Sequence, residues 1–213
     1  MLFSSILDFI FPNYCVRCHK RINYDSFTCE KCANILQYSK VKILQNHLAC
    51  DYVFAAFPYQ GIIKKAIIAF KFKQQRYLKK AFASKLIQVI DTYQIQFDSV
   101  IPVPISRKRY WERGYNQSAE IASILAKKFH KKMYDHLLQK IKDNPRQSTL
   151  SKNARQDNVK GVYQVKKTNQ LKEKTLLLVD DIFTTGATVS ECARVLKQSG
   201  AQKVIVLTIA YAR

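Results

Sequence analysis

The sequence predicts an α/β fold, a doubly wound and mainly parallel sheet with a small N-terminal module built on four cysteines. Short apolar runs, such as 176–179 and 203–209, alternate with segments whose apolar residues recur at helical spacing. This alternation is typical of βαβ units with right-handed crossovers, which build a parallel sheet covered on both faces. Four cysteines gather before residue 33 in two closely spaced pairs. We therefore expect the small module at 1–50 and the sheet domain at 51–213.

Basic side chains dominate the charged residues. The 213 residues include 36 Lys and Arg against 15 Asp and Glu, which gives a net charge of +21. The length suffices for one main domain with a small appendage, and a hydrophobic content of 47% excludes a disordered chain. The charge favours a polyanionic partner, namely nucleic acid, anionic lipid or a polyanionic substrate. The alternative is a basic composition shared by the proteins of the source organism.

The first twelve residues, MLFSSILDFIFP, are apolar but lack the features of a signal peptide. They have no basic leader before the apolar run and no small-residue cleavage site. No apolar run approaches the roughly 20 residues that span a bilayer. We expect a cytoplasmic protein without a transmembrane segment, whose first residues pack on the fold or on a partner.

The four clustered cysteines have the spacing of a structural zinc site. They form two C-x-x-C pairs separated by ten residues: Cys15 with Cys18, and Cys29 with Cys32. Each pair supplies two thiolates from a tight turn, and four thiolates complete the tetrahedral coordination of Zn²⁺. Two disulfides or free thiols are the alternative, but disulfides do not persist in a reducing cytosol.

The segment 61–90 is basic and contains no Asp or Glu. Its apolar residues predict two helices, and aromatic residues lie among its lysines. Lysines that hold phosphates beside aromatics that stack on bases would suit single-stranded DNA. The alternative is a solvated helix face. The candidate DNA-binding residues are Lys64, Lys65, Lys71, Lys73 and Arg76.

A second basic cluster follows the buried strand predicted at 97–104. Arg107, Lys108 and Arg109 are expected in a loop at the carboxyl edge of the sheet, where ligands bind in doubly wound folds. These cations would suit a pyrophosphate, and the alternative is a solvent-facing basic loop. A helix is predicted at 118–129, and a long loop at 143–165 that ends in a strand at 161–165.

The segment 175–188, TLLLVDDIFTTGAT, carries the clearest chemistry. Asp180 and Asp181 follow a buried strand, and their carboxylates can accept hydrogen bonds from the two hydroxyls of a ribose. A short loop and then a helix follow, an order that turns backbone N–H groups and the helix dipole toward a phosphate. The alternative is that this segment is an ordinary strand, turn and helix in which the two acids are solvated. The expected phosphate-binding residues are Thr184, Thr185, Gly186, Ala187 and Thr188.

This segment resembles the signature of type I phosphoribosyltransferases, which bind 5-phosphoribosyl-1-pyrophosphate (PRPP). Over nearly its whole length the chain resembles the ComF-type competence proteins, phosphoribosyltransferase-like proteins with an N-terminal zinc-binding module. The motifs that carry this resemblance are the paired cysteines, Tyr59-Gln60-Gly61, Lys71-Phe72-Lys73, PVPIS at 102–106, RGYNQ at 113–117, Gln147, Arg155, Asn158, Gly161 and LLLVDDIFTTGAT at 176–188.

The resemblance implies a PRPP-binding fold that uses Mg²⁺ with PRPP, and a role in natural transformation. In that role the protein would handle incoming single-stranded DNA on the cytoplasmic side of the inner membrane, with an uptake channel or helicase as partner. Carried over by position, Asp180 and Asp181 take the ribose, 184–188 the 5′-phosphate and 107–109 the pyrophosphate. The alternative is an active phosphoribosyltransferase that acts on an unidentified acceptor and does not bind DNA directly.

Overall fold

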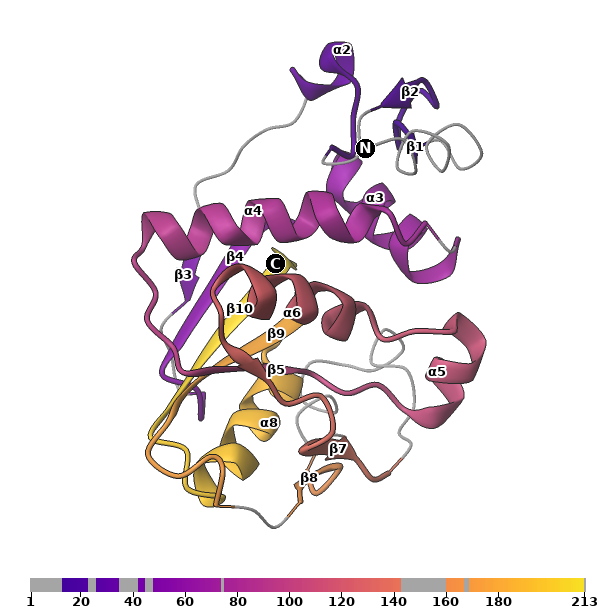
Figure 1. The fold of residues 1–213 in the computed structure, drawn as a ribbon. Helices are drawn as coiled ribbons and strands as arrows, with labels where there is room; N and C mark the ends of the chain where they lie inside the picture. Colours follow the sequence, from indigo (N-terminus) through magenta and orange to yellow (C-terminus); the bar gives the residue numbers. More distant parts are fainter. Residues whose placement is uncertain are drawn as a thin grey trace.

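A six-stranded sheet forms the centre of the protein. The computed structural model describes residues 13–22, 26–34, 42–44, 48–73, 75–142, 160–166 and 169–212 (Figure 1). The strand order is β3-β4-β10-β9-β5-β6, and all neighbours are parallel except β3, which runs antiparallel to β4. The predicted doubly wound, mainly parallel sheet is therefore confirmed. The strands are β3 (Lys42–Leu44), β4 (Tyr52–Pro58), β5 (Ser99–Pro102), β6 (Lys132–Met133), β9 (Thr175–Phe183) and β10 (Lys203–Tyr211).

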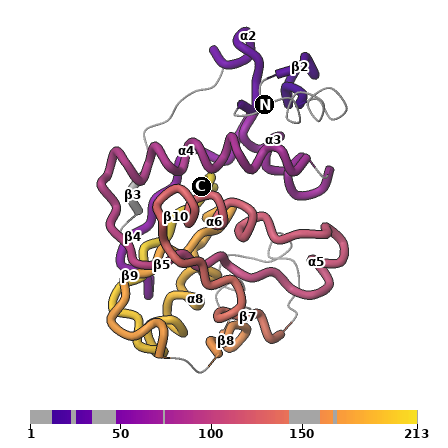
Figure 2. The backbone as a smooth tube through the Cα atoms, viewed as in Figure 1, coloured from indigo at the N-terminus to yellow at the C-terminus, as the bar shows by residue number. Residues whose placement is uncertain are grey.

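Helices cover both faces of this sheet. α3 (Gly61–Phe72), α4 (Leu78–Thr92) and α6 (Gln117–Lys128) share one hydrophobic cluster with the upper face in the view of Figures 1 and 2. α8 (Ala187–Gln198) packs on the opposite face, together with the hairpin of β7 (Leu138–Lys140) and β8 (Tyr163–Val165). Because both faces are covered, the central strands are continuously apolar and do not alternate with polar residues.

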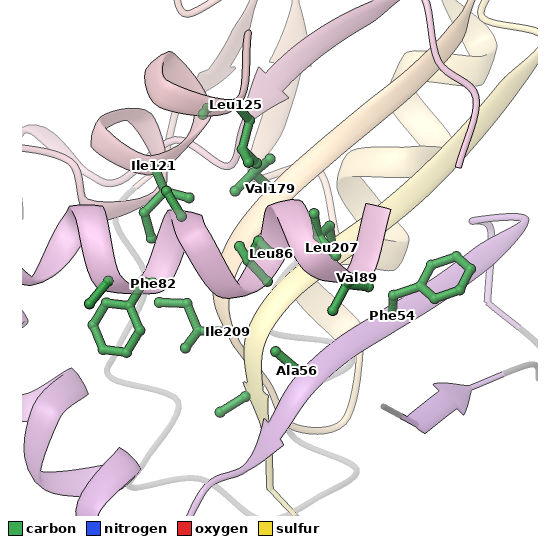
Figure 3. Close-up of a cluster of buried hydrophobic side chains, with 14 of the residues drawn as sticks. Phe54, Ala56, Phe82, Leu86, Val89, Ile121, Leu125, Val179, Leu207 and Ile209 are labelled. Atoms are coloured by element: carbon green, nitrogen blue, oxygen red, sulfur yellow. The ribbon is translucent and has the colours of Figure 1, made fainter. Parts of the chain in front are cut away.

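The core between the sheet and its upper helices is aliphatic with a few aromatic rings. Figure 3 shows Leu86 and Val89 of α4 lying over Leu207 of β10, while Leu125 of α6 lies over Val179 of β9. The helical spacing of these residues explains why α4 and α6 form here, since each helix buries one apolar stripe.

The sheet has a topological switch point between β5 and β9. From β5 the chain passes through α6 to the edge strand β6, whereas from β9 it passes through α8 to β10 on the other side. These two crossovers use opposite faces of the sheet, so a crevice opens at the carboxyl ends of β5 and β9. The predicted acids lie within the last part of β9, which extends to Phe183 and not only to the expected end at 179, and the predicted phosphate loop follows β9.

The prediction of a loop at 107–109 is wrong, because these residues begin the helix α5 (Arg107–Arg113). The Ser106 hydroxyl caps this helix by accepting a hydrogen bond from the Arg109 backbone N–H at 3.3 Å. Gly114 ends it with a φ of +76°, a conformation that glycine adopts without a steric cost. The strand predicted at 161–165 begins at Tyr163, and the segments 1–12 and 143–159 lie outside the described residues.

The cysteine-bearing segment packs on the sheet domain. It contains β1 (Asn13–Tyr14), β2 (Arg21–Ile22) and the short helix α2 (Glu30–Ala33). The buried ring of Phe27 lies 5.9 Å from the Phe57 ring and 5.3 Å from the Phe82 ring, measured between centroids. This aromatic contact joins the segment to the main core. Within the described residues, no helix is long and apolar enough to cross a membrane.

Candidate functional site

Two adjacent carboxylates lie at the carboxyl end of β9, in the crevice between β9 and β5. Asp180 is paired in register with Thr208 of β10, and Asp181 follows it. On the other side β5 ends beside Val179, whose carbonyl accepts a hydrogen bond from the Val103 backbone N–H at 2.9 Å. The chain after β5 therefore leaves the sheet next to Asp180.

Asp180 accepts hydrogen bonds from its surroundings at one oxygen. The Ser118 hydroxyl, in the first turn of α6, donates to Asp180 Oδ1 at 3.2 Å, and the Asp181 backbone N–H donates to it at 2.8 Å. Desolvation, and then the neighbouring charge of Asp181, raise the pKa of Asp180 to about 7 from its usual 3.8. A carboxylate with this pKa exchanges a proton near neutral pH.

Asp181 forms an ion pair with Lys71, which lies in the last turn of α3. The Lys71 Nζ lies 2.7 Å from Asp181 Oδ2, and the two side chains are only 17% and 14% exposed. The sequence analysis assigned Lys71 to the DNA-binding residues, but the structure places it in the carboxylate site. Lys64, Lys65 and Lys73, by contrast, are exposed. Helical spacing alone did not reveal this difference, because the sequence does not say which polar residue faces the end of β9.

The predicted phosphate loop connects β9 to the start of α8. Gly186 caps the helix with a φ of +79°, and a β-carbon there would lie 2.8 Å from Leu48 Cδ1 and 2.9 Å from the Phe183 ring. Thr184 is exposed, and Thr185 and Thr188 are half-buried. Ala187 and Thr188 belong to the first turn of α8, whose backbone N–H groups suit an anion.

The basic residues of α5 differ in their exposure. Arg107 and Lys108 are exposed, whereas Arg109 and Arg113 are half-buried. Burial lowers the pKa of Arg113, and the charge of Asp181 opposes that effect, so the two groups are within electrostatic reach. The Arg113 Nη1 donates to Gln117 Oε1 at 2.8 Å, while its buried Nε has no hydrogen-bond partner among the described residues.

Three residues of the site were missing from the sequence-based set: Tyr59, Arg113 and Ser118. Burial and the charge of Asp181 raise the pKa of Tyr59, which follows the end of β4. Arg113 begins the RGYNQ motif and Ser118 directly follows it, so this motif was the signal for both. The motif carries the family resemblance, but its sequence alone assigns no role to these residues.

The four clustered cysteines have a geometry that fits Zn²⁺. Their sulfur atoms all lie within 4.8 Å of one another, and the Cys18 and Cys29 sulfurs are 3.6 Å apart. Tetrahedral coordination with Zn–S bonds of about 2.3 Å separates the sulfurs by about 3.8 Å, so the two distances agree. Cys15 and Cys18 come from the turn between β1 and β2, and Cys29 and Cys32 from the start of α2.

The thiols of this cluster differ in acidity. Burial by itself would raise the pKa of Cys15, but hydrogen bonds from the backbone of Cys18, Cys29 and Arg17 lower it to about 6. Burial and the neighbouring sulfurs raise the pKa of Cys32 to about 12. Zinc needs all four as thiolates, so binding would release protons, among them that of Cys32.

Comparison with known proteins identifies relatives of this chain. A model of the phosphoribosyl transferase domain matches residues 71–213. Competence protein F of Haemophilus influenzae is 27% identical over 207 residues, covering 93% of this chain and 90% of that protein. DNA utilization protein YhgH of Escherichia coli is 26% identical over 200 residues, covering 90% and 87%. Competence protein ComFC of Streptococcus pneumoniae is 31% identical over 150 residues, covering 70% and 64%.

Among solved structures, the chain is similar to the glutamine PRPP amidotransferase of Bacillus subtilis. The match has a TM-score of 0.43 and 19% identity, and it covers 62% of this chain and 26% of that one. The domain match and the named relatives confirm the resemblance to ComF-type competence proteins that the motifs predicted.

Proposed function

Since the chain belongs to the phosphoribosyl transferase domain family, we propose that it is a competence protein that binds PRPP at the carboxylates of β9. A role in competence is supported by relatives that carry the names competence protein and DNA utilization protein along most of the chain. We propose the cytoplasmic side of the inner membrane as its place of action, and a division between its two parts near residue 50.

One observation carries the PRPP proposal. Asp180 and Asp181 lie at the switch point of the sheet, directly before a glycine-capped helix N-terminus. A ribose 5-phosphate carries two ring hydroxyls and a phosphate. In this proposal the two acids accept hydrogen bonds from the hydroxyls, and the 184–188 segment, which follows the acids in the chain, donates to the phosphate.

Of the predicted pyrophosphate residues, Arg107 and Lys108 are exposed, whereas Arg109 is half-buried. The charge of Arg109 acts on Arg113, which also feels the charge of Asp181. Arg109 and Arg113 would therefore supply the charge that neutralises a pyrophosphate.

The site residues also suit the metal that accompanies PRPP. Mg²⁺ prefers oxygen ligands, and the carboxylate oxygens of Asp180 and Asp181 are of that kind. When bound, Mg²⁺ would neutralise pyrophosphate charge. Lys71 contacts only Oδ2 of Asp181, so the other carboxylate oxygen could accept from a ribose hydroxyl while this ion pair is kept.

Calorimetric titration of the zinc-loaded protein with PRPP and Mg²⁺ tests this proposal. We expect saturable binding that is lost in the double variant Asp180→Asn/Asp181→Asn. The matched control is Asp91→Asn/Glu173→Gln, which removes the same charge at two exposed positions and should bind as the wild type does. Equal binding by the site variant would refute the assignment of the carboxylates.

We further propose that the protein handles single-stranded DNA during transformation, with an inner-membrane uptake channel or helicase as partner. The net charge of +21 supports this proposal, because Lys and Arg that neutralise phosphates release counterions. Lys64, Lys65 and Lys73 are exposed, and so is Arg76, although Arg76 is paired with Glu120. The affinity for oligonucleotides should fall steeply as salt concentration rises, and binding that is insensitive to salt would contradict an electrostatic mode.

Turnover of PRPP is the second candidate function. The pKa of about 7 at Asp180 favours it, because a general base works best when its pKa is near the working pH. Release of pyrophosphate, measured with PRPP, Mg²⁺ and a panel of nucleobases and amines, tests this function. Release that depends on both Asp180 and an added acceptor would establish an enzyme, whereas binding without release would leave PRPP as a ligand.

A further inference from the structure

A wide groove lies between α5, α6 and the hairpin strand β7, beside the crevice that holds the carboxylates. Its volume is about 1270 Å³. Pockets that enclose a small ligand usually hold roughly 300–1,000 Å³, so this groove is large for such a ligand. Arg76 is the one residue of the predicted DNA-binding set among those that line it.

α5 is placed on this groove although it contributes nothing to the core. None of its seven residues is buried, and the helix is held at its ends by the Ser106 cap and by Gly114. Tyr110 is 52% exposed and Trp111 is 85% exposed, and both line the groove. In Figure 1 this helix lies at the edge of the molecule, away from the central sheet. Two neighbouring exposed aromatics on a capped helix have no packing role here, so they are available to stack on a ligand.

The charge of the groove favours a polyanion. Five cationic side chains line it, against two carboxylates, Glu120 and Asp135. Glu120 is paired with both Arg76 and Lys79, and Asp135 lies 3.2 Å from His136. Arg107 and Lys142 are exposed at the groove. A chain of phosphates that carries bases would find cations and stacking surfaces together at this place.

We propose that this groove between α5, α6 and β7 binds single-stranded DNA, with bases stacked on Trp111 and Tyr110 and phosphates held by Arg107 and Lys142. The inference rests on the proposed DNA-handling function and specifies its site. The sequence predicted the main contact with DNA on α3, whereas this proposal places that contact in the groove, with Arg76 common to both. Base stacking on aromatic rings is tolerant of sequence, so the groove would accept a strand of any composition.

The connection from β5 to α6 links this groove to the carboxylate site. Pro104, Ile105 and Asn116 line the groove, and the Asn116 Nδ2 donates to the Val103 carbonyl at 3.0 Å. Two residues later, Ser118 donates to Asp180. A strand bound in the groove would therefore pass next to the proposed PRPP site without entering it.

The single tryptophan of the chain gives a direct probe of this site. Adding a 20-nucleotide oligo(dT) to the wild-type protein should quench Trp111 fluorescence in a saturable manner, because a base stacks on the indole. With a labelled oligonucleotide and anisotropy detection, Trp111→Ala should bind about tenfold more weakly, whereas Trp111→Phe, which keeps a ring, should stay within about threefold of the wild type. All of these side chains are exposed, so the variants should fold.

A charge variant with a matched control distinguishes DNA binding in the groove from DNA binding on α3. Arg107→Gln/Lys142→Gln should lower the slope of log affinity against log salt by about 1.4, since each phosphate contact on a single strand contributes about 0.7. Lys64→Gln/Lys65→Gln removes the same charge on α3 and should change the slope little. If only the α3 variant weakens binding, the groove proposal is overturned while DNA handling stands. If the wild-type protein binds no oligonucleotide, both proposals fail together.

Discussion

Replacing Asp180 with asparagine should stabilise the protein at alkaline pH. The ionised Asp180 lies next to Asp181 in a poorly solvated site, and its pKa is raised from 3.8 to about 7. An asparagine has a similar shape, carries no charge and can still accept the Ser118 hydrogen bond. Its amide can also donate toward Asp181. The variant therefore removes electrostatic repulsion without leaving a cavity.

The raised pKa sets the magnitude and the sign of this effect. Below about pH 3, Asp180 is protonated in both the native and the unfolded state, so it contributes no penalty. Between pH 4 and pH 7 the native state binds more protons than the unfolded state, and stability falls as pH rises. At pH 8 the full penalty is roughly 4 kcal/mol, from 1.36 kcal/mol per pKa unit. Because asparagine is a weaker acceptor than a carboxylate, we expect a net gain of roughly 2–4 kcal/mol.

Urea denaturation of the zinc-loaded proteins at pH 5.5 and pH 8 measures this gain. About half of the penalty is present at pH 5.5, so the advantage of Asp180→Asn should grow by about 2 kcal/mol between the two pH values. Lys71→Gln should enlarge the pH dependence of the otherwise wild-type protein, because the Lys71 charge lowers the pKa of Asp180. If Asp180→Asn has the same stability as the wild type at both pH values, the proposed penalty from desolvation of Asp180 and repulsion by Asp181 is refuted.

Three further predictions concern the cysteine cluster and the turn before α8. Phe27→Ala should lower the free energy of unfolding by about 3–5 kcal/mol, measured in urea, because it empties the contact with the main core; a loss below 1 kcal/mol would show that the segment does not stabilise the domain. Cys32→Ser should abolish zinc binding and lower Tm, whereas Cys50→Ser, outside the cluster, should retain the metal by atomic absorption; unchanged zinc content in Cys32→Ser would contradict the site. Gly186→Ala should destabilise the protein by about 1–3 kcal/mol in thermal unfolding through its positive φ and the contact with Leu48, and a neutral result would contradict that strain.

Local sequence determined those features whose chemistry lies in consecutive residues. The spacing of Cys15, Cys18, Cys29 and Cys32 predicted a cluster, and the structure brings their sulfurs together. The apolar run before Asp180 predicted a buried strand, because a parallel strand covered on both faces is continuously apolar. The sequence predicted a loop at 107–109, where the structure has the start of α5. The serine before this helix and the glycine after it are typical helix caps, and they were the signal for a helix.

The tertiary structure alone decided which distant residues share the site. Helical spacing shows that α3 buries Ile67 and Phe70, but it does not show that the next residue, Lys71, faces Asp181. The same holds for Ser118 at Asp180, and for the groove shared by α5, α6 and β7. The physical reason is that periodicity reports which face of an element is removed from water, whereas the partner of a polar side chain depends on strand order and on how each helix crosses the sheet.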